Sequence, residues 1–137
     1  MRPPSVHSVW VPLRGVGRSR AVFLIPNVPS PAVIQAIANF AAREKLRPRA
    51  SPAPNQLILS RGSEAIAGMA MIIILVWDVP GGCSVSVEAW VETMLGDQNA
   101  DKNAINDMFA RRRLWKTLGR LCDDLGAPGA RAMFQHA

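Results

Sequence analysis

The chain has 137 residues, which is enough for one domain and too few for two substantial hydrophobic cores. Its hydrophobic fraction of 49% excludes a disordered chain, because that much apolar material can bury a core. The 16 basic residues against 10 acidic ones give a formal net charge of +6, and 13 of the 16 are arginine. A guanidinium fits phosphate oxygens as a fork of donors, so this balance favours a nucleic-acid partner. A GC-rich genome, which encodes arginine often, explains the arginine count equally well.

The N-terminal 43 residues contain arginines but no carboxylate, a composition that organelle transit peptides share. The prolines in this stretch would break the amphipathic helix of such a peptide: Pro3, Pro4, Pro12 and Pro26. The longest apolar run, residues 65–77, is shorter than the roughly 20 residues that a membrane-spanning helix requires. We therefore expect a cytoplasmic protein that does not bind membranes.

Two strands are predicted at the start of the chain. Residues 6–13 alternate between apolar and polar side chains, which is typical of a half-buried strand. Glycines in the segment 14–20 allow a turn, and residues 20–25 then predict a returning strand. The result is an expected hairpin whose tip carries Arg14, Arg18 and Arg20.

A helix is predicted from Ser30, as the N-cap, to about Leu46, where Pro48 ends it. Pro31 suits the first helical position, where no backbone N–H is needed. The apolar positions that recur at helical spacing predict its buried face: Val33, Ile37, Phe40 and Ala41. A proline-rich loop is expected at 47–55.

Three further strands are predicted, over residues 56–60, 65–77 and 83–93. The uniformly apolar run 65–77 suits the centre of a sheet. In 83–93, Val85 and its alternate neighbours face one side, and Trp90 lies on the polar side with Glu88 and Glu92.

A long helix over 101–125 follows, ending at Gly126, and the tail 126–137 is predicted to be irregular. Leucines on this helix, Leu114, Leu118, Leu121 and Leu125, are expected to pack against the chain's own sheet rather than in a dimeric zipper. The predicted fold is a single α+β domain in the order β-β-α-β-β-β-α. It has an antiparallel sheet of about five strands with two helices packed on one face.

The last predicted helix carries the clearest candidate for a functional surface. Its basic residues, close to Trp115, could hold a phosphate backbone: Arg111, Arg112, Arg113, Lys116 and Arg120. The alternative is an ordinary solvated helix face, on which Asp107–Arg111 and Arg120–Asp124 form ion pairs at i,i+4 spacing.

A second candidate combines the hairpin tip with two tryptophans. Arg14, Arg18 and Arg20 resemble the basic arms that nucleic-acid binders insert into a groove. Trp10 and Trp90 both lie on the polar side of an alternating strand, where an exposed ring could stack on a base. An oligomer interface, or cover by the C-terminal tail, explains tryptophans on this side equally well.

Catalytic and metal-binding motifs are missing from the sequence. His7, Cys83, Cys122 and His136 include no pair with the short spacing of a zinc site. Two reduced cysteines are expected, with a Cys83–Cys122 disulfide as the alternative. We expect no enzyme activity, no metal and no cofactor.

The leading hypothesis is thus a non-catalytic module that binds single-stranded or structured RNA or DNA. Because the charged fraction is only 19%, part of the surface can be apolar, and an assembly subunit or homo-oligomer is the first alternative. A carrier that encloses a small apolar ligand between the sheet and the last helix is the second.

Overall fold

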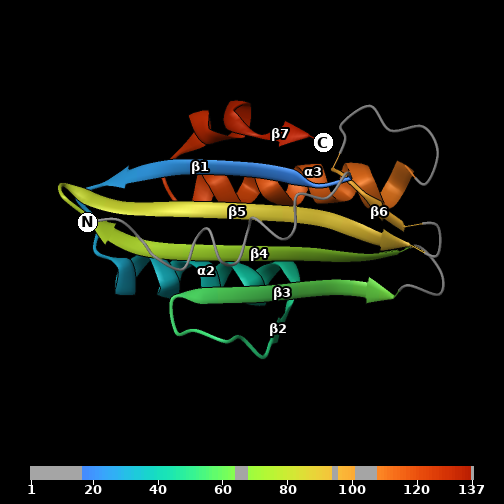
Figure 1. The fold of residues 1–137 in the computed structure, drawn as a ribbon, viewed down its shortest axis with the longest axis horizontal. Helices are drawn as coiled ribbons and strands as arrows, with labels where there is room; N and C mark the ends of the chain where they lie inside the picture. The colour runs from blue at the N-terminus through green and yellow to red at the C-terminus, as the bar shows by residue number, and fades with distance from the viewer. Residues whose placement is uncertain (1–16, 64–67, 94–95, 101–107, 137) are drawn as a thin grey trace.

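The computed structural model describes residues 17–63, 68–93, 96–100 and 108–136, and these form a single α+β domain (Figure 1). An antiparallel sheet is packed against two main helices, which both lie behind it in Figure 1. In chain order the elements are β1 (Ser19–Pro26), α2 (Ser30–Glu44), β2 (Arg47–Arg49), β3 (Gln56–Ser63), β4 (Gly68–Val79), β5 (Gly82–Thr93), β6 (Gly96–Gln98), α3 (Met108–Asp124), the 3₁₀ helix η2 (Pro128–Met133) and β7 (Gln135–His136).

The strands are ordered β2-β3-β4-β5-β1-β7, and β6 pairs with the end of β5. The predicted central position of the apolar run 65–77 is confirmed for its described part, because β4 lies between β3 and β5. Both faces of β4 are buried, with Ile74 on one and Leu75 on the other. This explains why β4 lacks the alternation of β1, whose residues are buried and exposed in turn.

The hydrophobic core lies between one face of the sheet and the two helices, as predicted. Helix α2 contributes Val33, Ile37, Phe40 and Ala41, and α3 contributes Leu114, Leu118 and Leu121, followed by Leu125 just after its end. Burial of each large side chain stabilises the fold by about 1.5–3 kcal/mol. The leucines of α3 therefore serve the chain's own core.

The prediction that Ser30 caps α2 is wrong. The N-cap is Pro29, and Ser30 is already inside the helix. The cap comes from Asp78 at the end of β4, whose carboxylate accepts from the Ser30 N–H at 2.8 Å and from the Ser30 hydroxyl at 3.0 Å. A carboxylate distant in sequence thus satisfies an orphan donor at the positive end of the helix. The helix ends at Glu44, earlier than predicted, because Lys45 adopts the left-handed conformation with φ 58°.

The prediction of an irregular tail is also wrong. Residues 128–133 form η2, and β7 extends the sheet by pairing His136 with Ser19 and Gln135 with Arg20. Phe134, between the two elements, is buried. Part of the predicted loop 47–55 is likewise ordered, because Arg47–Arg49 pairs with β3 as the edge strand β2. The predicted strand 6–13 and the first residues of the predicted helix 101–125 lie outside the described residues.

Both cysteines are free and buried, so the structure contains the reduced pair and no Cys83–Cys122 disulfide. Burial raises the pKa of the Cys122 thiol to about 11, which keeps it protonated and unreactive near neutral pH. None of the described helices has the length and the apolar character needed to cross a lipid bilayer.

Candidate functional site

Helix α3 presents three different faces. Its leucines are buried in the core, whereas Arg112, Arg113 and Lys116 are exposed to solvent. Arg111 and Trp115 lie one helical turn apart and face the C-terminal segment formed by η2 and β7. The exposed face and the C-terminal face are the two candidate functional regions of this helix.

The name basic surface is used here for Arg112, Arg113 and Lys116. Their side chains make no hydrogen bond or ion pair with another residue in the described part of the chain. Arg61 of β3 lies beside this surface, and its Nη2 donates to the Thr117 hydroxyl of α3 at 2.8 Å. Burial lowers the pKa of Arg61, and the positive charge of Arg113 lowers it further. The basic surface therefore carries positive charge that nearby acids do not fully compensate.

Arg120, also predicted as a site residue, is held by an acid of the other main helix. Its Nε and Nη2 donate to the two carboxylate oxygens of Glu44 at 2.9 and 2.7 Å. The predicted Arg120–Asp124 pair is wrong, because Asp124 forms its ion pair with Arg43 of α2. The hydrogen bond from Arg120 holds the pKa of Glu44 below its ordinary value, which burial opposes. These contacts join the ends of α2 and α3.

Arg18 and Arg20 belong to an internal charge network on β1 and β5. Arg18 donates to Glu88 at 2.6 Å and to Asp97 at 2.8 Å, and Arg20 donates to Glu88 at 2.8 Å. The Glu88 side chain is 0% exposed. The Arg18 guanidinium also lies 3.7 Å from the centroid of the Trp90 ring. The network therefore occupies both arginines with residues of the chain itself.

Trp90 lies on the polar side of β5, as predicted, but its ring is not open to solvent. Only 4% of the residue is exposed, and Arg18 covers one face of the ring. Arg14 and Trp10, the remaining predicted site residues, lie outside the described residues. The structure thus brings together Arg112, Arg113 and Lys116 from the predicted set, and it places Arg18, Arg20 and Trp90 in a separate network.

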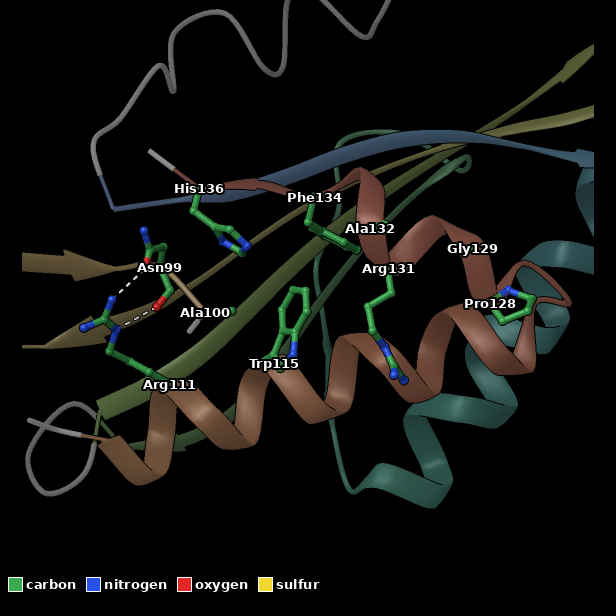
Figure 2. Close-up of a pocket in the computed structure, with 10 residues that line it drawn as sticks. All are labelled: Asn99, Ala100, Arg111, Trp115, Pro128, Gly129, Arg131, Ala132, Phe134 and His136. Atoms are coloured by element: carbon green, nitrogen blue, oxygen red, sulfur yellow. Dashed lines mark hydrogen bonds between the residues drawn. The ribbon is translucent and has the colours of Figure 1, made fainter. Parts of the chain in front are cut away.

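The C-terminal face of α3 borders a pocket of about 680 Å³ (Figure 2). Three aromatic rings surround it. The Trp115 ring lies 6.1 Å from Phe134 at an interplanar angle of 79°, and 5.4 Å from His136 at 62°. Two arginines, Arg111 and Arg131, also line the pocket. A combination of aromatic walls with polar and charged groups is suited to a ligand that has both an apolar and a polar part.

Hydrogen bonds fix the side chains at one end of this pocket. Arg111 donates from Nε to the Asn99 backbone oxygen at 2.8 Å and from Nη2 to the Asn99 side-chain oxygen at 2.6 Å (Figure 2). Ser19 Oγ accepts from the Ala100 N–H at 3.0 Å and lies 2.6 Å from His136 Nδ1. Ser19 is fully buried, so its hydroxyl ties β7 to the first residue of β1 inside the fold and fixes the position of the His136 ring.

The pocket was not predicted from the sequence, because the tail that forms one side of it was expected to be irregular. Phe134 and His136 approach Trp115 only after η2 and β7 have folded back along β1. One sequence signal was available in Gly119, an isolated glycine in an otherwise strong helical pattern, since such a residue often has a packing reason.

No group of three or more His, Cys, Asp or Glu side chains suited to a metal ion occurs among the described residues. Comparison of the chain with protein-family models, with curated proteins and with solved structures found no match. A function for this protein therefore has to be inferred from the basic surface and the pocket themselves.

Proposed function

We propose that this protein binds nucleic acid, as single-stranded or structured RNA or DNA, through the basic surface of α3. The observation that carries the proposal is the exposure of Arg112, Arg113 and Lys116 on one helix without an acidic partner in the described part of the chain. Cations placed in this way gain the most from contact with phosphates, because no internal ion pair has to be broken first.

The surroundings of the basic surface support the same proposal. Arg61 is largely buried, and its pKa is lowered in part by repulsion from Arg113. A phosphate between these two guanidiniums would relieve that repulsion. The formal net charge of +6 would add long-range attraction to a polyanion.

The affinity for oligonucleotides should fall as the salt concentration rises. If each of the three cations of the basic surface displaces one counterion from a single strand, the log–log slope of affinity against salt is about −2. Engagement of all the predicted arginines would give a steeper slope. The pairs formed by Arg18, Arg20 and Arg120 support the shallower value.

Fluorescence anisotropy with labelled single-stranded DNA and RNA tests the proposal. We expect a Kd of roughly 1–100 µM near physiological salt and tighter binding at low salt. The variant Arg112→Ala with Lys116→Ala should weaken binding and make the salt slope shallower by about 1.4. The matched control is Arg47→Ala with Arg49→Ala, which removes equal charge from the exposed strand β2. Equal losses in both variants, or no binding at low salt, would reject the basic surface as the site.

A second candidate function, a self-associating subunit, is favoured by Val22 and Leu24 on β1. These two apolar side chains are 51% and 52% exposed. They lie on the face of the strand opposite Phe23 and the core. Sedimentation velocity of the wild type and of Val22→Ser with Leu24→Ser tests this alternative. A monomeric wild type at all concentrations would reject it.

A further inference from the structure

We propose that the pocket between α3 and the η2–β7 segment is a binding site for a small molecule that combines a flat aromatic ring with an anionic group. This proposal goes beyond nucleic-acid binding by the basic surface, because it depends on Trp115, Arg131, Phe134 and His136. None of these residues belongs to the basic surface. Either proposal can therefore fail without the other.

The aromatic residues of the pocket would hold the ring of the ligand. Trp115 meets Phe134 and His136 edge-on, so the three rings contact one another without stacking, and all three line the same pocket. Figure 2 shows Trp115 rising from α3 toward Phe134 and His136 on the opposite side. The volume of about 680 Å³ lies within the usual range of ligand pockets, roughly 300–1,000 Å³. A planar ring in this space would contact aromatic surface on more than one side.

Arg131 would hold the anionic group of the ligand. Arg131 extends from η2 toward α3 in Figure 2, where its nearest acid is Asp123 with an N–O distance of 3.7 Å. This ion pair is long and its side chains are about half exposed, so it competes weakly with a bound anion. A carboxylate or phosphate can accept two parallel hydrogen bonds from a guanidinium. Arg131 is therefore the anion-binding group of the proposed site.

Gly119 explains how Arg131 reaches this position. A Cβ atom at residue 119 would lie 2.1 Å from Nη2 of Arg131 and 2.6 Å from its Cζ, so any larger residue would displace the guanidinium. Glycine is unfavourable inside a helix. Its presence at this position on α3 leaves room for Arg131 against the helix, beside Trp115. Gly119 is thus a positioning residue for the proposed anion site.

His136 adds a polar group to the wall. Its Nδ1 lies 2.6 Å from Ser19 Oγ, which fixes the orientation of the ring at the edge of the pocket. Arg111, held by Asn99, adds a second guanidinium along the lining. The pocket lining therefore includes two guanidiniums, which suits a ligand rich in acceptor oxygens.

Two kinds of molecule share the required chemistry, namely nucleoside monophosphates and aromatic carboxylates. Isothermal titration calorimetry with AMP and with indole-3-acetate distinguishes them. Adenosine and ribose 5-phosphate serve as the ring alone and the anion alone. We expect one of the two complete ligands to bind at least about tenfold more tightly than either half, because the ring and the anionic group are bound by different residues.

Variants then locate the binding. Trp115→Ala and Arg131→Gln should each weaken the affinity by about tenfold or more, whereas Arg112→Ala should leave it unchanged. Gly119→Ala should also weaken it, though less than Arg131→Gln, because the added Cβ displaces the guanidinium without removing its charge. Circular dichroism checks that each variant is folded. If Gly119→Ala is unstable, Arg131→Gln still tests the site, because it changes only an exposed side chain.

The proposal is overturned if neither AMP nor indole-3-acetate binds at millimolar concentration, or if Arg131→Gln binds them as well as the wild type. Oligonucleotide anisotropy on the same variants separates the two proposals. Loss of small-molecule binding in Arg131→Gln with unchanged oligonucleotide binding would support both of them.

Discussion

Two arginine-rich regions of this molecule use the same side chain in opposite ways. On β1 and β5, Arg18 and Arg20 converge on Glu88, which is 0% exposed. On α3, Arg112 and Arg113 point to solvent and have no acidic partner in the described part of the chain. The number of arginines is therefore a poor guide to function. What matters is whether the fold brings a carboxylate to each guanidinium.

The physical reason lies in the geometry of the two elements. Adjacent strands place Arg20 directly opposite Glu88, and a buried carboxylate has to be compensated by cations. The outer side of α3 has no neighbouring element to supply an acid to Arg112 among the described residues, so its charge is balanced by solvent. The first region stabilises the fold, and the second is available for a partner.

The largest effect on the free energy of unfolding is expected when the charge network around Glu88 is broken. Glu88→Gln removes the negative charge that both arginines share, and the free energy of unfolding should fall by about 3 kcal/mol. Urea denaturation followed by circular dichroism measures this change. The control is Glu92→Gln, because Glu92 is a partly exposed carboxylate on the same face of β5. This variant should lower the free energy of unfolding clearly less than Glu88→Gln does. Equal stability of Glu88→Gln and wild type would mean that the network is not structural.

Glu44 is intermediate between the buried Glu88 network and the exposed basic surface. Its side chain is 16% exposed, and it joins Arg120 of α3 to α2. Its pKa in the folded state is lowered chiefly by the hydrogen bond from Arg120. The ionised carboxylate therefore gives its full contribution to stability at pH values above the pKa that Glu44 has in the unfolded chain. That contribution is lost as the pH falls through the lower pKa of the folded state. The stability difference between wild type and Glu44→Gln should therefore shrink between about pH 7 and about pH 3. A constant difference over this range would contradict the pairing.

The smallest effect on stability is expected at the basic surface. Arg112→Ala with Lys116→Ala should change the free energy of unfolding by no more than about 0.5 kcal/mol, because both side chains are exposed and unpaired in the described structure. The same variant is the one expected to lose oligonucleotide affinity. A large loss of stability would instead place these residues with Arg18 and Arg20 as structural cations.

Much of the fold was predictable from local patterns. The apolar stripe with Val33 and Phe40 and the inward-facing set around Val85 depend only on helical and strand periodicity, and both are confirmed. The polar side of β5 was expected to face solvent and is instead buried from Val85 to Val91. Helix capping was not predictable, because Asp78 is 48 residues away from the Ser30 that it caps. The same holds for Arg120, whose partner Glu44 is 76 residues away.

Of the two candidate sites, the basic surface was predictable from the local sequence and the pocket was not. The exposure of Arg112 and Lys116 follows from helical periodicity, and the sequence predicts them as a cluster. The pocket depends on Phe134 and His136 meeting Trp115, which requires η2 and β7 to return along β1. No local rule predicts that return, since the tail has neither helical nor strand periodicity.

By itself, the sequence determined the α+β class, the two core-facing helix stripes and the basic character of α3, because each depends on near neighbours in the chain. The tertiary structure alone decided which arginines are neutralised and where a pocket lies. Those outcomes depend on contacts such as Arg18–Glu88 and Ser19–His136, which are 70 and 117 residues apart. An ion pair or a pocket wall is a property of distances in space, and the folded topology sets these distances.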